Sequence, residues 1–189
     1  MALVLMVIAP ERFRDEELFD TQAELTQAGH RTVIASTQVG LRPGSRGGHA
    51  AAELTLAQVR CDDYAAVVFV GGGGSKLLFQ DADARRIAAT MAQAGKVTAA
   101  ICLAPVILAN AGVLAGRQAT VAGAEAATIE AGGAHYTGPG VTVDGNLVTA
   151  NGPKSSRLFG RAIAQLLAAR LKPQQRVQSR PAPTRDEPA

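Results

Sequence analysis

Short runs of continuous apolar residues recur along the chain, separated by segments with mixed apolar and polar positions. The runs are rich in β-branched residues and too short for helices, so they predict buried strands. Strands are expected at residues 3–9, 31–36, 65–70 and 97–101, with shorter ones at 119–121, 141–143 and 147–149. Strands that are apolar on both faces are typical of a parallel sheet covered by helices on each side.

The segments between these strands have apolar residues near helical spacing. Helices are expected at residues 15–28, 81–94, 103–111 and 153–171. Gly29 and Gly95 directly follow the first two and are typical helix-ending residues. Residues 41–48 are expected to form a turn-rich connection. The alternation predicts the α/β class: a flavodoxin-like, doubly wound, mostly parallel sheet sandwiched between helices.

The composition indicates one globular domain. The chain has 189 residues, of which 47% are hydrophobic and 19% charged, which suits a single domain with a substantial core. We expect this domain at residues 1–172. From residue 173 the chain is rich in Pro, Gln and Arg, so residues 173–189 are expected to form a disordered tail. A net charge of only +3, with no basic cluster, predicts no nucleic-acid partner.

Two apolar segments bear on location. The N-terminal run has no basic residues before it, so it indicates a buried strand and not a signal peptide. The 20 uncharged residues 97–116 are long enough to cross a bilayer. Pro105 and Asn110 interrupt them, and they divide into a strand, a turn and a helix. We expect no membrane partner and a cytoplasmic location.

Cys102 carries the first sign of chemistry, because it falls where a buried strand meets a helix. This is the position of a nucleophile elbow, although the usual G-x-S-x-G form is absent. The positive end of a helix dipole predicts a thiol pKa well below the ordinary value of about 8.5, and hence a reactive thiolate. The alternative is a small buried side chain without a chemical role.

Two further segments follow expected strands. The glycine run 71–74 allows backbone N–H groups to approach a reacting atom, and with the N–H of Leu103 it forms a candidate oxyanion hole. The alternative is a flexible turn. Glu17 lies in the acidic start of the first helix, where it projects into the site or simply complements the helix dipole. Cys61 and Cys102 are too far apart for a C-x-x-C motif, and no metal site is expected.

These elements occur together, and in this order, in one known superfamily. The chain resembles the ThiJ/PfpI (DJ-one) superfamily, which has the class I glutamine amidotransferase-like fold, over about residues 2–171. The matching motifs are Phe13-x-Asp15-x-Glu17-Leu18, Gly71-Gly72, Ala99-Ala100-Ile101-Cys102, Ala111-Gly112-Val113-Leu114-x-Gly116 and Val143-Asp144-Gly145-Asn146.

The resemblance implies a role for each candidate residue. Cys102 would be the nucleophile, and Glu17 would be a protonated acid that donates a hydrogen bond to its thiolate. The backbone N–H groups of Gly72 and Leu103 would be the oxyanion donors. The resemblance also implies a homodimer or a larger homo-oligomer. No cofactor and no metal are expected.

The chain departs from the peptidase-like members of that superfamily. Those members have a histidine directly after the cysteine, where this chain has Leu103, so the adjacent base of a Cys-His pair is missing. They also have an acid shortly after the glycine pair, where this chain has Ser75 and Lys76.

Three functions remain open at this point. The first is a stress-protection enzyme that acts on small reactive carbonyl compounds through Cys102 and Glu17, as a glyoxalase or deglycase. The second is a non-catalytic redox sensor or chaperone that responds to oxidation of Cys102. The third is an intracellular cysteine peptidase, which the missing histidine disfavours.

Overall fold

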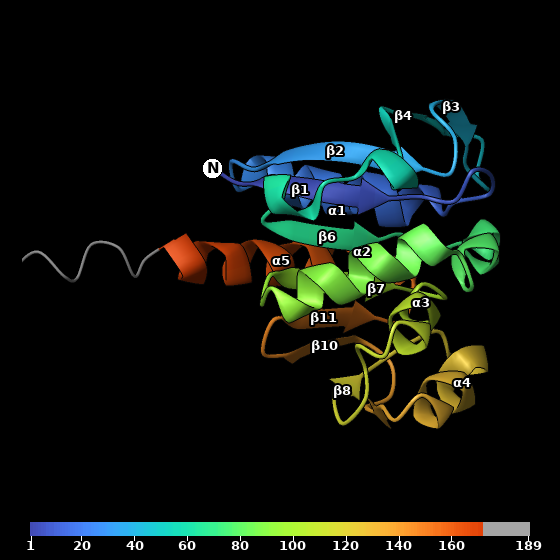
Figure 1. Cartoon of the computed structure of the whole chain (residues 1–189), viewed down its shortest axis with the longest axis vertical. Coiled ribbons are helices and arrows are strands. Elements are labelled where there is room, and N and C mark those ends of the chain that lie inside the picture. Colours follow the sequence, from blue (N-terminus) through green and yellow to red (C-terminus); the bar gives the residue numbers. More distant parts are fainter. Residues whose placement is uncertain (172–189) are drawn as a thin grey trace, which may run out of the picture.

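A seven-stranded sheet forms the centre of the molecule (Figure 1). The computed structural model describes residues 1–171, so the expected domain boundary at 172 and the expected tail lie outside the described residues. In spatial order the strands are β10 (Val141–Asp144), β11 (Leu147–Ala150), β7 (Val97–Ile101), β6 (Ala66–Phe69), β1 (Leu3–Val7), β2 (Arg31–Ser36) and β5 (Leu54–Thr55). All are parallel except β10, which pairs antiparallel with β11.

Helices cover both faces of this sheet. On one face α1 (Asp15–Gln27) packs along α5 (Ser156–Leu171), and on the other α2 (Ala82–Gln93) packs against α3 (Pro105–Asn110) (Figure 1). Alternate residues of β1 point to opposite faces: Leu5 joins the core under α2 and α3, and Met6 joins the core under α1 and α5. The α/β, doubly wound fold class predicted from the sequence is therefore confirmed.

Short elements differ most from the prediction. The segment expected to be turns is part of a hairpin of β3 (Gly40–Pro43) and β4 (His49–Ala52). A two-stranded sheet of β8 (Gln118–Ala119) and β9 (His135–Tyr136) lies where one strand was expected, and α4 (Ala126–Ala131) was not expected. The short 3-10 helices are η1 (Leu56–Gln58), η2 (Cys61–Asp63), η3 (Gly73–Leu78), η4 (Gly123–Glu125) and η5 (Pro153–Ser155). These elements are too short for their periodicity to be read from the sequence.

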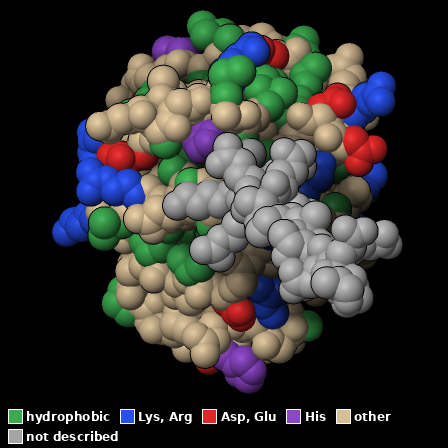
Figure 2. Space-filling model, turned by 90° about the vertical axis from the view of Figure 1, so that its left-hand side faces the viewer, with side chains coloured by type: hydrophobic (Ala, Val, Ile, Leu, Met, Phe, Trp, Pro, Cys, Tyr) green, Lys and Arg blue, Asp and Glu red, His purple; other side chains and the backbone are tan. Residues whose placement is uncertain are grey.

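The structure also bears on the apolar segments. No helix within residues 1–171 combines the length and the apolar character needed to cross a membrane. The uncharged run 97–116 divides into β7, a turn and α3, as expected. Figure 2 shows the face at the amino ends of the strands, where positive and negative side chains both lie around the margin.

The opposite end of the sheet gathers the residues singled out from the sequence. Cys102 follows β7, Gly71 and Gly72 follow β6, and Glu17 belongs to the helix after β1. The sheet order makes β7, β6 and β1 direct neighbours, so their carboxyl ends meet at one edge.

Candidate active site

Cys102 has the backbone of an elbow. Its φ is +64°, in the left-handed region that side chains other than glycine rarely adopt. Hydrogen bonds on both sides hold this conformation: the Cys102 N–H donates to the Ala150 carbonyl at 2.9 Å, and the Ala122 N–H donates to the Cys102 carbonyl at 2.8 Å. Cys102 is half-buried, and it directly follows β7 at the carboxyl edge of the sheet.

Glu17 is fully buried beside this elbow. Its Oε2 accepts a hydrogen bond from the Gly71 N–H at 2.9 Å, whereas its Oε1 has no conventional partner among the described residues. The thiol of Cys102 interacts with the carboxyl group and acts to lower the Glu17 pKa. Burial is the larger influence, because it disfavours the charged form, and it raises the pKa of Glu17 to about 7.

The pKa of Cys102 corrects one expectation. Burial, followed by the charge of Glu17, raises the pKa of this thiol to about 11, so the predicted value well below about 8.5 is wrong. The helix that was expected to lower the pKa begins only at Pro105 and has six residues, and its dipole therefore offers little compensation for lost hydration.

The two acids titrate as a unit. The pair loses its first proton near pH 7 and its second near pH 11, so it carries a single negative charge over the range between, mainly on Glu17, whose pKa is the lower of the two. A thiolate exists in this range whenever Glu17 carries the remaining proton. A nucleophilic sulfur and a proton donor are then present at the same time.

The glycine run is a steric requirement of the site. A Cβ on Gly71 would lie 2.5 Å from both the Cys102 Cβ and the Glu17 Oε2. A Cβ on Gly72, whose φ is +100°, would lie 2.5 Å from the Arg14 N, and one on Gly74 would overlap the carbonyl oxygen of Glu11. The glycines therefore let the loop after β1 and the elbow after β7 approach the same backbone.

Two backbone amides face the sulfur. The N–H groups of Gly72 and Leu103 lie close enough to Cys102 to act on its thiol, and they lower its pKa. The structure thus brings together the four residues expected from the sequence: Cys102, Glu17, Gly72 and Leu103. Amides arranged in this way stabilise negative charge on sulfur or on an oxygen bonded to a neighbouring carbon.

Asp15 is a supporting residue that the sequence motif contained without revealing its contacts. It is buried at the start of α1, and its carboxylate accepts hydrogen bonds from the Arg46 N–H at 3.0 Å and the Gly48 N–H at 2.6 Å. These bonds attach the β3–β4 hairpin to the helix that carries Glu17. The partners are more than 30 residues away along the chain, so no local pattern predicts them.

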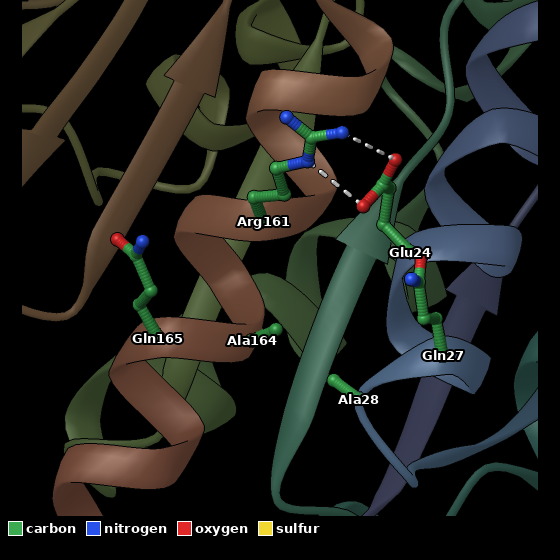
Figure 3. Close-up of a pocket in the computed structure, with 6 residues that line it drawn as sticks. All are labelled: Glu24, Gln27, Ala28, Arg161, Ala164 and Gln165. Atoms are coloured by element: carbon green, nitrogen blue, oxygen red, sulfur yellow. Dashed lines mark hydrogen bonds and ion pairs between the residues drawn. The ribbon is translucent and has the colours of Figure 1, made fainter.

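One cavity among the described residues lies elsewhere. It has a volume of about 360 Å³ and lies between α1 and α5, where Glu24 accepts a hydrogen bond from Arg161 Nε at 2.9 Å (Figure 3). The other lining residues are Gln27, Ala28, Ala164 and Gln165. Among residues 1–171, no cluster of three His, Cys, Asp or Glu side chains suits a metal ion.

The fold and the elbow define a flavodoxin-like protein with a cysteine at the sheet edge. A model of the DJ-1/PfpI family matches residues 2–166. An uncharacterized protein of Methanocaldococcus jannaschii is 43% identical over 169 residues, which are 88% of this chain and 82% of that protein. The deglycase PfpI of Pyrococcus furiosus is 33% identical over 164 residues, 86% of this chain and 98% of that protein.

Solved structures agree with the family match. The crystal structure of a ThiJ/PfpI domain protein from Brachyspira murdochii has a TM-score of 0.87 at 34% identity, covering 88% of this chain and 96% of that chain. The chain therefore belongs to the DJ-1/PfpI family, as the motifs of the sequence predicted.

Proposed function

We propose that the protein is a cysteine-dependent enzyme that acts on small reactive carbonyl compounds in the manner of a glyoxalase or a deglycase. The observation that carries this proposal is the placement of Cys102 beside the buried Glu17, with the amides of Gly72 and Leu103 facing the sulfur. The description of the Pyrococcus furiosus relative as a deglycase supports it.

The first step is addition of the Cys102 thiolate to an aldehyde such as methylglyoxal. A carbon–sulfur bond forms, the carbonyl double bond opens, and its oxygen takes the proton held by Glu17. The product is a hemithioacetal. The amides of Gly72 and Leu103 stabilise the negative charge that passes from sulfur to oxygen during this step.

The second step is a proton transfer by the Glu17 carboxylate. Glu17 takes the hydrogen of the former aldehyde carbon as a proton and delivers a proton to the ketone carbon, while the hydroxyl proton moves to the ketone oxygen. This gives a thioester of lactate, and water then cleaves the carbon–sulfur bond. One carbon is oxidised and its neighbour is reduced, so no external oxidant enters. When the aldehyde arrives bound to an amine as a hemiaminal, the thiolate displaces the amine: the carbon–sulfur bond forms, the carbon–nitrogen bond breaks, and the amine leaves with the proton held by Glu17, which gives the same hemithioacetal.

The test is lactate formation from methylglyoxal by purified protein. We expect turnover in the wild type, loss of at least a hundredfold in Cys102→Ala, and a comparable loss in Glu17→Gln, since a positioned acid–base group contributes about 10²–10⁴ in rate. Cys61→Ala and Glu16→Gln are matched controls: Cys61 is the other free cysteine, and Glu16 is the neighbouring carboxylate, which forms an ion pair with Arg14. Equal turnover in wild type and Cys102→Ala would refute the proposal.

Redox sensing is the second candidate, and it is favoured by the half-buried Cys102 beside Glu17, whose Oε1 has no hydrogen-bond partner within residues 1–171. Two molecules of peroxide would oxidise the Cys102 thiol to a sulfinic acid and form two molecules of water. A protonated Oε1 would then donate a hydrogen bond to the sulfinate. Mass gain of two oxygen atoms at Cys102, together with no turnover of methylglyoxal, would favour this function.

A peptidase receives less support. After burial, the largest influences on the pKa of the Cys102 thiol come from Glu17, Gly72 and Leu103, and not from a histidine. Without an adjacent histidine, only the Glu17 carboxylate is placed to take the proton of the thiol.

A further inference from the structure

Ser75 is a fully buried hydroxyl three residues after Gly72. Its Oγ donates a hydrogen bond to the Gly72 carbonyl at 2.7 Å, and its backbone N–H donates to the same oxygen at 3.0 Å. Ser75 thus donates two hydrogen bonds to the carbonyl of Gly72, and the N–H of this same glycine is a candidate oxyanion donor. The mechanism described above assigns no role to this hydroxyl.

The other side of Gly72 is held as well. The carbonyl of Gly71 accepts a hydrogen bond from the Arg14 N–H at 3.0 Å. This carbonyl and the Gly72 N–H belong to one peptide unit, and in a trans peptide they point in opposite directions, so the bond from Arg14 turns the Gly72 N–H toward Cys102. Glycine has wide freedom in φ and ψ, and the two flanking anchors remove it.

We propose that Ser75 is a positioning residue, which fixes the Gly72 N–H against the Cys102 sulfur by locking the next carbonyl of the chain. The expected effect of Ser75 on turnover rests on the proposed function, whereas its expected effect on the reactivity of the Cys102 thiol does not. The Ser75 hydroxyl donates its hydrogen bond to the Gly72 carbonyl and acts on the sulfur through Gly72.

The chain contains a matched control for this hydrogen bond. Ser156 is also fully buried, and its Oγ donates to the carbonyl three residues earlier, that of Pro153, at 2.8 Å. Ser156→Ala therefore removes the same kind of bond from a carbonyl that is not next to the thiol donors. If the Ser75 hydroxyl had only a structural role, Ser75→Ala and Ser156→Ala would change the reactivity of Cys102 to a similar extent.

The experiment measures the rate at which iodoacetamide alkylates Cys102 between pH 6 and 10. All variants carry Cys61→Ala, so that Cys102 is the one cysteine that can be alkylated. We expect Ser75→Ala to slow alkylation at pH 8 by about three- to tenfold, which corresponds to the loss of one hydrogen bond. The midpoint of the pH profile should move upward, because a misplaced amide stabilises the thiolate less. Ser156→Ala should leave rate and midpoint unchanged, and Ser75→Thr, which keeps the hydroxyl, should stay within about twofold of wild type.

Turnover of methylglyoxal provides the second readout. Ser75→Ala should lower kcat by a factor similar to the loss in alkylation and leave KM unchanged. An unchanged alkylation profile in Ser75→Ala would overturn the proposal, as would equal effects of Ser75→Ala and Ser156→Ala, or of Ser75→Ala and Ser75→Thr. If the wild type has no turnover, the proposed function fails, and the alkylation profile still decides the role of Ser75.

Discussion

At the scale of single residues, one buried carboxyl group and one strained cysteine determine the chemistry. Burial raises the pKa of Glu17 to about 7, and the positive φ of Cys102 presents its sulfur to the same space. The identities of both residues were predictable from their motifs. Their pKa values were not, since burial of a side chain depends on packing between segments that are far apart in the sequence.

Glu17 should make folding stability depend on pH. Its pKa is about 7 when folded and near 4.5 when exposed, so the folded state binds more protons between these values, and stability falls as pH rises. The stabilisation is complete below about pH 4.5 and is lost through pH 7, a change of about 3 kcal/mol. Urea unfolding of wild type and Glu17→Gln from pH 5 to 8 measures it.

The measured quantity is the difference in unfolding free energy between wild type and Glu17→Gln, because the other carboxyl groups titrate in both proteins. The unfolding free energy of wild type should fall relative to that of Glu17→Gln as pH rises over this range. Glu16→Gln should run parallel to wild type, since the pKa of Glu16 is lowered and not raised. A constant difference between wild type and Glu17→Gln would show that Glu17 ionises as readily in the folded protein as in water.

At the scale of elements, the glycine run joins three loops. Gly71 separates Cys102 from Glu17, and Gly74 lies against the loop after β1, so these glycines are required by close approach more than by flexibility. The run itself was apparent in the sequence, and its position after a strand was predicted. The β3–β4 hairpin was missed, because its anchor to Asp15 is a long-range contact and its strands are short.

Two substitutions in this run should behave in opposite ways. Gly71→Ala places a methyl group 2.5 Å from Cys102 Cβ and Glu17 Oε2, so it should abolish turnover and lower the melting temperature. Gly73→Ala meets nothing within 4 Å and should leave both nearly unchanged. Lactate formation and thermal unfolding of the two variants check this. Similar losses in both variants would indicate that the run needs flexibility throughout.

At the scale of the whole molecule, the site depends on how α1 is seated on the sheet. Leu18 and Leu25 of α1 share a hydrophobic core with Phe159 and Ile163 of α5. The two helices approach closely at Gly160, where a Cβ would lie 2.9 Å from Glu24 Cβ. The layered architecture followed from strand and helix periodicity, but this helix contact did not, since periodicity does not reveal which residues of two helices touch.

Enlarging Gly160 should therefore weaken the fold. Gly160→Val forces α5 away from α1, and we expect a loss of about 1–3 kcal/mol in unfolding free energy by urea denaturation. Ala168→Val is the matched control, because Ala168 is exposed on the same helix and the change carries only the small helix-propensity cost of a β-branched residue. Equal losses in the two variants would mean that the α1–α5 contact contributes nothing at Gly160.

The pH profile of kcat/KM for methylglyoxal tests the central claim most directly, namely that Cys102 and Glu17 share one proton. Turnover in the wild type should rise with pH to a plateau, with a midpoint near 7 where the pair loses its first proton. In Glu17→Gln the residual activity should lack this midpoint and rise only at higher pH, as the thiol alone ionises. An unchanged midpoint near pH 7 in Glu17→Gln would contradict the shared proton.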